Sequence, residues 1–207
     1  WKKIEAALRT GSPHNAATAL ICLENTHNMA GGTVYPLEIV DEVCAEAHER
    51  GVKVHMDGAR VFNASVALNV PVARIVRDVD SVMFCLSKGL GAPVGSMLAG
   101  TRDDIEQARL YRKRLGGGMR QAGILAAAGL IALLESPAHL EEDHANARFL
   151  AEALAELPGI RIDPSRVRTN IVIFDVSALA ISAAEFVGRL KSYGVVAGAG
   201  TYTRLRL

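Results

Sequence analysis

The stretch "PLEIVDEVCAEAHERGVKVHMDGA", residues 36–59, carries a helix signal followed at once by a strand signal. Its first part has apolar residues at helical spacing, with Pro36 as a start signal and Gly51 as a stop signal. Its last part, "VKVHMDGA", is typical of a strand that ends in a turn. A strand-like run, "TALICLENT" at 18–26, precedes the helix. Strand, helix and strand in alternation predict a right-handed crossover between parallel strands.

The same pattern continues along the first half of the chain. "DSVMFCLS", residues 80–87, is almost entirely apolar and predicts a strand buried on both faces. "GSMLAG", residues 95–100, predicts one more short strand, and residues 2–9 predict a helix. We therefore expect several parallel strands in one sheet, covered by helices.

The second half is helical at first and then changes character. Residues 103–135 predict helix with a break at "GGGMRQ", because three consecutive glycines each cost about 1 kcal/mol inside a helix relative to alanine. Residues 136–157 predict a further helix, and short strand and helix signals follow from 169 to the end. We expect residues 1–136 to belong to a large domain and 137–207 to a smaller α+β domain. Since the last strand pattern stops at Leu207 without a closing helix, we also expect a longer protein.

Composition limits the classes of function. The 207 residues are 50% hydrophobic, and 23 basic against 22 acidic residues give a net charge of +1. This balance does not favour nucleic acid or a membrane surface as partner, and no apolar run approaches the roughly 18 residues of a membrane span. We expect a soluble, cytoplasmic protein that acts on small molecules. Cys22, Cys44 and Cys85 have neither disulfide nor zinc spacing, so we expect reduced core cysteines and no metal site.

Polar residues that directly follow the apolar runs are the candidates for chemistry, because open parallel sheets bind ligands at the carboxyl ends of their strands. Asp57 and Arg60 follow one strand, and Ser87 with Lys88 follow another. An ammonium beside so apolar a strand is expected to be partly desolvated, which makes its amine a better nucleophile. Taken singly, Asp57 also fits a turn, Arg60 a surface ion pair and Lys88 an ordinary strand end.

Together these residues favour pyridoxal 5'-phosphate chemistry. A lysine amine forms a Schiff base with this cofactor, a carboxylate keeps its pyridine nitrogen protonated, and an arginine helps to fix the substrate. Asp57 precedes Lys88 by about thirty residues, so both stand at strand ends. A nucleotide phosphate loop is excluded, because Lys88 precedes the glycines of "SKGLGAPVG" instead of following them.

Four motifs also resemble a known family. "LENTHN" (23–28), "HMDGARVFNA" (55–64), "CLSKGLGAPVGS" (85–96) and "RKRLGGGMRQAGILAAAGLIAL" (112–133) resemble the low-specificity L-threonine aldolases of the β-eliminating lyase family. The resemblance covers residues 4–140 and continues more loosely to the end. It implies a fold-type I pyridoxal-phosphate enzyme, in which a mostly parallel sheet with helices on both faces precedes a smaller α+β domain.

The implied reaction is the cleavage of L-threonine or L-allo-threonine into glycine and acetaldehyde, a carbon–carbon lyase step that serves threonine catabolism and glycine biosynthesis. The resemblance also implies a homotetramer, built as a dimer of dimers. Two alternatives stay open: another pyridoxal-phosphate lyase, racemase or aminotransferase on the same scaffold, or a catalytically incomplete fragment.

The resemblance assigns roles residue by residue. Lys88 matches the Schiff-base lysine, Asp57 the partner of the pyridine nitrogen, and Arg60 the arginine near the ring oxygen and the substrate carboxylate. His14 matches a histidine near the substrate hydroxyl and is the candidate base. Arg206 matches the arginine that binds the α-carboxylate, with Arg204 as the neighbouring alternative.

The remaining assignments are supporting ones. Ser87 is a further cofactor-binding candidate and Asn25 lies behind the site, whereas Lys113 and Arg120 match basic residues that approach the cofactor from a neighbouring subunit. In this family the loop that holds the cofactor phosphate and the histidine stacked on the ring lie upstream of the position of Trp1, and further helices follow the last strand. We therefore expect a partial chain.

Overall fold

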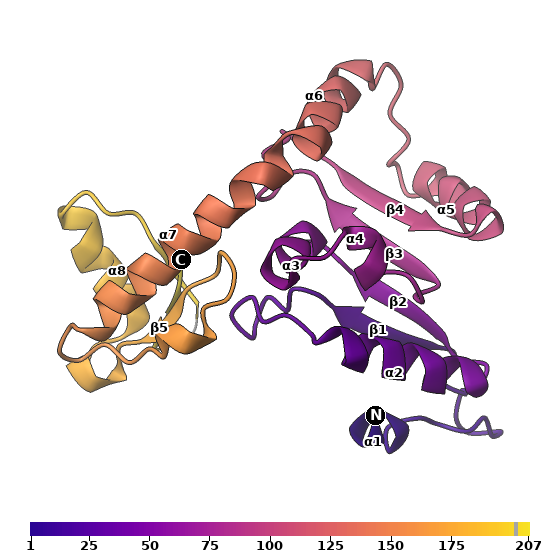
Figure 1. Cartoon of the computed structure of the whole chain (residues 1–207), viewed down its shortest axis with the longest axis horizontal. Helices are drawn as coiled ribbons and strands as arrows, with labels where there is room; N and C mark the ends of the chain where they lie inside the picture. Colours follow the sequence, from indigo (N-terminus) through magenta and orange to yellow (C-terminus); the bar gives the residue numbers. More distant parts are fainter. Residues whose placement is uncertain (201–202) are drawn as a thin grey trace. The chain divides into compact units, whose positions relative to one another are not determined.

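The computed structural model describes residues 1–200 and 203–207, which divide into two compact units (Figure 1). The first unit comprises Trp1–Thr26 and Tyr35–Ala138, and the second comprises His27–Val34 and His139–Leu207. Residues 27–34 therefore cluster with the C-terminal part of the chain, although they follow a strand of the first unit.

The first unit is built on a four-stranded sheet. Its strands lie in the order β1 (Leu20–Glu24), β2 (Lys53–Asp57), β3 (Ser81–Cys85) and β4 (Ser96–Gly100). β1, β2 and β3 are parallel, as predicted, and β4 runs antiparallel to β3. The register pairs Glu24 with Asp57 and Asp57 with Met83. The carboxyl ends of the three parallel strands consequently meet at one edge of the sheet.

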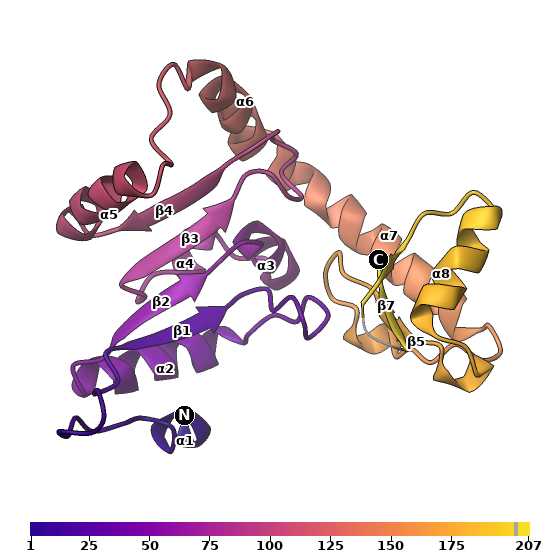
Figure 2. The same cartoon turned by 180° about the vertical axis from the view of Figure 1, so that it is seen from behind.

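Six helices accompany this sheet, and three of them lie on one of its sides. The helices are α1 (Lys2–Glu5), α2 (Leu37–Glu49), α3 (Val61–Leu68), α4 (Val72–Ile75), α5 (Arg102–Arg114) and α6 (Gly123–Leu134). Figures 1 and 2, which view the sheet from opposite sides, show α2, α3 and α4 together on the same side. α2 begins after Pro36 and its backbone turns at Gly51 (φ +68°), as the sequence predicts.

Burial alternates along the strands according to this one-sided cover. Ile21 and Leu23 of β1 are buried, whereas Leu20 is 48% exposed and Cys22 is exposed. The expectation that all three cysteines are core residues is therefore wrong for Cys22, because alternate strand residues point to opposite faces. Cys44, on the buried face of α2, follows the expectation, and burial raises the pKa of its thiol to about 11.

Two local predictions need correction. The helix expected over residues 2–9 ends at Glu5, and none of its residues is buried, so that no packing stabilises a longer helix. β3 is only partly buried, not buried on both faces as its apolar sequence indicated. The break between α5 and α6 lies at the predicted glycines, where Gly116 has φ +82°.

The second unit combines helices with a three-stranded antiparallel sheet of order β5-β7-β6. After the short η1 (Ser136–His139), its elements are α7 (Leu140–Ala155), η2 (Pro164–Arg166), β5 (Ile173–Asp175), η3 (Ser177–Leu179), α8 (Ala183–Ser192), β6 (Gly198–Ala199) and β7 (Arg204–Arg206). Phe174, Val176 and Leu205 form its core with Ala151 and Ala183 of the helices.

Residues 27–34 are attached to this second core. The hydroxyl of Thr169, which is fully buried, donates a hydrogen bond of 2.8 Å to the carbonyl oxygen of Gly32. Gly32 has φ +70°, and a Cβ placed there would collide with that hydroxyl oxygen. A glycine is therefore required at this contact.

Across residues 1–200 and 203–207, no single helix is both long and apolar enough to cross a membrane, although α6 and the helical segment after it reach that length and hydropathy together across a bend.

Candidate active site

Asp57 stands at the carboxyl end of β2, where the sequence predicts it. Its side chain is half-buried, and Oδ1 accepts a hydrogen bond of 3.0 Å from the backbone N–H of Ala59. Its backbone oxygen accepts another, of 2.9 Å, from the N–H of Asn25 at the end of β1. The backbone therefore fixes this carboxylate between two strand ends.

Gly58 locks the end of β2 against β3. Its N–H donates a hydrogen bond of 2.8 Å to the carbonyl oxygen of Met83, and a Cβ at this position would lie 2.9 Å from that same oxygen. No side chain fits at so short a distance from a backbone atom. The glycine after Asp57 is thus a condition of the close approach of the two strands.

Lys88 lies three residues beyond the end of β3, in a turn held by buried leucines. Leu86 is paired through its backbone with Gly95 (2.9 Å) and Ala92 (3.0 Å), and both Leu86 and Leu90 are buried. Ser87 and Lys88 themselves are exposed. The expected desolvation of Lys88 is therefore wrong for this chain, because the strand ends at Cys85 and the turn carries the amine into solvent.

Arg60 lies on the same edge as Asp57. It is the N-cap residue of α3, it is half-buried, and its carbonyl oxygen accepts the N–H of Ala64 at 3.2 Å. The turn at Gly58 thus brings Asp57 and Arg60, which the sequence predicts to follow one strand, to the start of α3, a helix that the sequence did not predict.

Asn25 has a property that the sequence did not reveal, namely a buried amide without hydrogen-bond partners among the described residues. It directly follows β1, its exposed fraction is 0%, and neither its amide oxygen nor its amide nitrogen has a hydrogen-bond partner within residues 1–200 and 203–207. A buried polar group without a partner costs about 1–3 kcal/mol. Strand-end position alone marks Asn25 as a candidate, whereas only the structure shows that its amide is buried and unsatisfied.

Asn25, Asp57 and Lys88 form what we call the strand-end cluster, since they follow the neighbouring strands β1, β2 and β3. Together they supply an amide, a carboxylate and an amine at one edge of the sheet.

The structure does not bring His14 to this cluster. His14 is exposed in a turn, where its N–H donates to the hydroxyl of Ser12 at 3.2 Å. The segment between α1 and β1 lies at the amino end of β1, away from the strand-end cluster (Figure 2). Its role as the base stays a prediction from the resemblance.

Lys113 and Arg120 are exposed, on α5 and in the loop before α6. Their approach to the cofactor of a neighbouring subunit stays a prediction from the resemblance. Within the described residues, no group of three or more His, Cys, Asp or Glu side chains is arranged to hold a metal ion.

Arg204 and Arg206 belong to the second unit and lie on β7. The register pairs Arg204 with Asp175, and Nε lies 4.0 Å from Oδ2 of that carboxylate. Arg206 is paired with Ile173 and lines a cavity of about 540 Å³ with Met29 and Ile173. Arg206 is thus a candidate ligand for an external carboxylate, and Arg204, which lines the same cavity, stays the alternative.

The chain is similar to enzymes that act on amino acids. It is 46% identical over 207 residues to low-specificity L-threonine aldolase 1 of Arabidopsis thaliana, covering 99% of this chain and 58% of the relative. It is 43% identical over 203 residues to the low specificity L-threonine aldolase of Escherichia coli K12, covering 98% and 59%. The chain therefore spans a little under three fifths of the length of these curated relatives.

Solved structures show the same fold at lower identity. The threonine aldolase of Leishmania major matches with a TM-score of 0.75 and 21% identity, over 100% of this chain and 60% of that chain. The methionine gamma lyase CalE6 of Micromonospora echinospora matches with a TM-score of 0.67 and 22% identity, over 99% and 62%.

The model of the beta-eliminating lyase family matches residues 1–178, which is most of the chain. The matched range contains the whole strand-end cluster, Arg60 and the helices that support them. The chain belongs to the beta-eliminating lyase family.

Proposed function

We propose that this chain is part of a pyridoxal-phosphate-dependent aldolase that splits L-threonine or L-allo-threonine into glycine and acetaldehyde. The observation that carries the proposal is the strand-end cluster, in which an amine, a carboxylate and an unsatisfied buried amide follow three adjacent strands. The names of the curated relatives support the substrate class.

The residues present fit this cofactor. Its aldehyde suits the exposed amine of Lys88, and its basic ring nitrogen suits the carboxylate of Asp57. The amide of Asn25, which lacks a partner among the described residues, can bond to a polar group of the cofactor. Ser87 and Arg60 would complete the polar surroundings.

The residues of the chain divide the chemical work among them. The bound cofactor supplies an electron sink for the pair left when the Cα–Cβ bond breaks. Asp57 would keep the ring nitrogen protonated, and Lys88 would both anchor the cofactor and return a proton to Cα. Arg60 of the first unit and Arg206 of the second unit are the candidates that the resemblance gives for holding the substrate carboxylate. The proton of the β-hydroxyl passes to a base, for which His14 is the candidate, so that acetaldehyde leaves and glycine remains.

Assembly as a homotetramer belongs to the same proposal. α6 exposes Ile124 and Leu134 to 87% and 78%, and apolar side chains of this size are typical of surfaces that other protein covers. Lys113 near the end of α5 and Arg120 in the loop before α6 would reach the cofactor of a neighbouring subunit.

Lys88→Ala tests the proposal, with Lys191→Ala on α8 as the matched change of another exposed lysine. We expect Lys88→Ala to lose the visible absorbance of lysine-bound cofactor and to release glycine and acetaldehyde from threonine roughly 10³-fold more slowly or worse. Lys191→Ala is expected to keep both. Full glycine release by Lys88→Ala would refute the role of Lys88, and a product other than glycine and acetaldehyde would favour another lyase, a racemase or an aminotransferase.

A further inference from the structure

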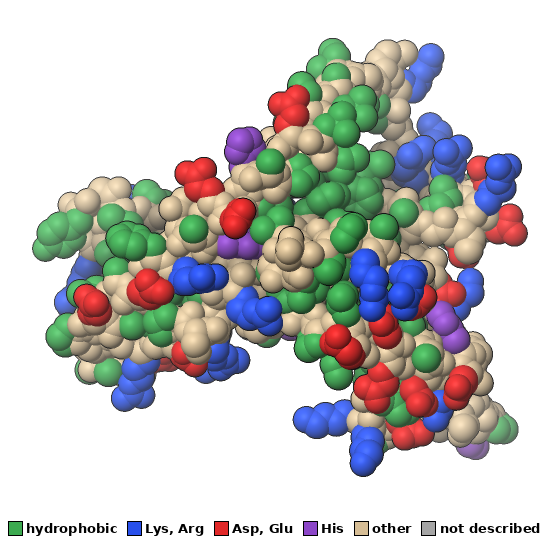
Figure 3. Space-filling view, in the orientation of Figure 1, with side chains coloured by type: hydrophobic (Ala, Val, Ile, Leu, Met, Phe, Trp, Pro, Cys, Tyr) green, Lys and Arg blue, Asp and Glu red, His purple; other side chains and the backbone are tan. Residues whose placement is uncertain are grey.

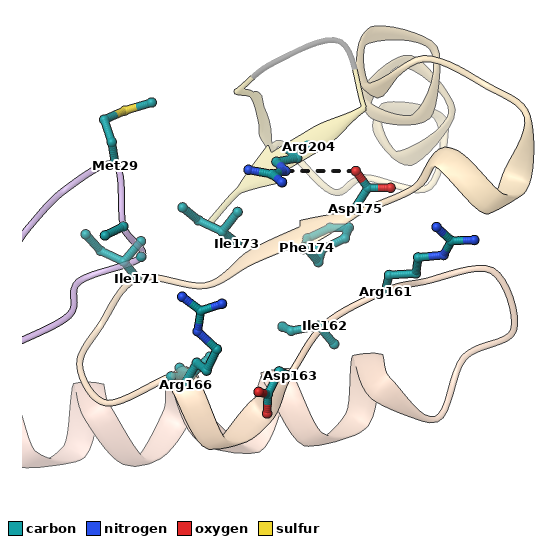
Figure 4. A pocket seen from close by; sticks show the side chains of 13 residues that line it. Met29, Arg161, Ile162, Asp163, Arg166, Ile171, Ile173, Phe174, Asp175 and Arg204 are labelled. Carbon is teal, nitrogen blue, oxygen red and sulfur yellow. Dashed lines mark ion pairs between the residues drawn. The ribbon is translucent and has the colours of Figure 1, made fainter.

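The second unit contains another cavity, which shares Met29, Ile173 and Arg204 with the cavity that Arg206 lines but does not include Arg206. It has a volume of about 260 Å³, and three arginines and two aspartates stand among its lining residues (Figure 4). Arg161 and Arg166 belong to one short run, residues 161–166, and Arg204 stands on β7, so that the fold brings two segments distant in the sequence together. We call this cavity the arginine pocket.

The guanidinium groups of the pocket form no close ion pair among the described residues. Arg204 is 67% exposed and only approaches Asp175, at 4.0 Å. Within residues 1–200 and 203–207, no hydrogen bond or ion pair is recorded from the guanidinium groups of Arg161 and Arg166. Figure 4 shows Arg166 and Arg204 on either side of Ile173, with Arg161 farther along the pocket. Each guanidinium carries five N–H donors, which leaves many of them available.

The two aspartates, by contrast, are satisfied by neutral donors. Oδ1 of Asp163 accepts hydrogen bonds from the N–H (3.0 Å) and the hydroxyl (2.6 Å) of Ser165. Asp175 accepts the N–H of Ser177 at 2.7 Å and the hydroxyl of Thr203 at 2.8 Å. These bonds, first those of Ser177, lower the pKa of Asp175, so it stays ionised at neutral pH. Three cations against two anions leave the pocket with a net charge of +1.

The rest of the lining is apolar and limits the size of a ligand. Ile162, Ile171, Ile173 and Phe174 form walls beside the arginines, and Met29 stands at the edge (Figure 4). Pockets for small molecules typically measure about 300–1,000 Å³. A volume of about 260 Å³ therefore suits a small anion with a short organic group.

We propose that the arginine pocket binds the phosphate group of a small phosphate monoester, with the organic part against the isoleucine wall. A phosphate offers three terminal oxygens and a charge of about −1.5 to −2 at neutral pH, which matches several guanidinium forks better than the two oxygens of a carboxylate. The proposal concerns the second unit alone and does not depend on the aldolase activity.

Calorimetric titration with phenyl phosphate, inorganic phosphate and benzoate, at constant ionic strength and with pyridoxal phosphate already bound, tests the proposal. We expect saturable binding of phenyl phosphate, weaker binding of inorganic phosphate because it lacks the apolar part, and weaker binding of benzoate because it lacks the third oxygen. The double variant Arg161→Gln/Arg166→Gln is expected to bind phenyl phosphate at least tenfold more weakly. Arg189→Gln, which changes an exposed arginine of α8 paired with Glu185, is expected to bind as before.

A second measurement locates the ligand without any variant. In methyl-labelled NMR spectra of the unchanged chain, phenyl phosphate is expected to shift the methyl signals of Ile162 and Ile171, which line this pocket and not the cavity beside Arg206. Any one of four results would overturn the proposal: no binding at millimolar concentration, equal affinity of the double variant, benzoate as good as phenyl phosphate, or isoleucine signals that do not move. Binding that disappears when pyridoxal phosphate is present would also overturn it, since the probe would then report the cofactor site.

Discussion

In the strand-end cluster the backbone at the edge of the sheet fixes Asn25 and Asp57, whereas the polar groups of the arginine pocket stand on long side chains at the surface. Asn25 is fully buried, and its N–H is bonded to the carbonyl oxygen of Asp57. Arg204, in the second unit, is 67% exposed and its ion pair measures 4.0 Å. The first arrangement suits chemistry that needs fixed positions, and the second suits a ligand that the side chains close upon.

The largest difference between the two units is expected in the free energy of unfolding when a glycine of each is replaced by alanine. Gly58→Ala places a Cβ 2.9 Å from the carbonyl oxygen of Met83 and is expected to lower the free energy of unfolding by about 1–3 kcal/mol. Gly198→Ala on β6 is the matched change in the second unit, where the nearest atom to the added Cβ lies at 4.0 Å, and it is expected to stay within about 0.5 kcal/mol. Urea unfolding of both variants measures the contrast. Equal effects would show that the strand end is no more tightly packed than β6.

Asn25→Ala separates binding from stability. Removing an unsatisfied amide is expected to leave the stability of the cofactor-free chain unchanged or to raise it by about 1 kcal/mol. Affinity for pyridoxal phosphate is expected to fall about tenfold, since one hydrogen bond is worth roughly 1 kcal/mol or somewhat more.

Asn63→Ala is the control for this prediction. Asn63 is 3% exposed and does not lack a partner, so its removal is expected to destabilise the chain. Thermal unfolding and absorbance titration give the two readouts. A cofactor-free Asn25→Ala chain that unfolds as easily as Asn63→Ala would mean that the amide of Asn25 serves structure instead of the ligand.

The smallest effect is expected at the opposite end of the sheet, in acid. Burial raises the pKa of Asp80, but the N–H of Val54 at 2.7 Å and His48 at 2.9 Å outweigh burial and leave the pKa lowered. The stability from this group is therefore present above the unfolded pKa of about 3.9 and is lost as the pH falls through the lower folded pKa. Asp80→Asn is expected to lose about 1 kcal/mol at pH 7 and to show a flatter loss below pH 4 than the unchanged chain.

Asp175 offers the comparison within the second unit. Its pKa is also lowered, first by Ser177 and then by Thr203, so its contribution is lost over the same acid range. Unfolding curves between pH 3 and 7 for Asp80→Asn and Asp175→Asn measure both. If Asp80→Asn leaves the pH dependence of the free energy of unfolding unchanged, Asp80 does not contribute to the acid sensitivity of the sheet.

Features that depend on the periodicity of apolar residues and on the position of strand ends could be predicted from the sequence. Helical spacing between Pro36 and Gly51 located α2, and the strand-end rule found Asp57 and Lys88. The periodicity of apolar residues does not indicate the direction of a strand, so the antiparallel orientation of β4 was not predicted. It does not contain the covered face either, which is why the exposure of Cys22 was missed. The burial of Asn25 depends on neighbours distant in the sequence, such as Asp57.

Because residues 27–34 belong to the second unit, they determine how the chain can be divided into fragments that each contain one whole unit. Because the polypeptide crosses between the units after residues 26, 34 and 138, no single cut separates them into whole pieces. A C-terminal piece begun at His139 would lack Gly32 and leave the buried hydroxyl of Thr169 without its acceptor. A version of the second unit that is expressed by itself therefore has to include residues 27–34, joined by a linker to one end of residues 139–207.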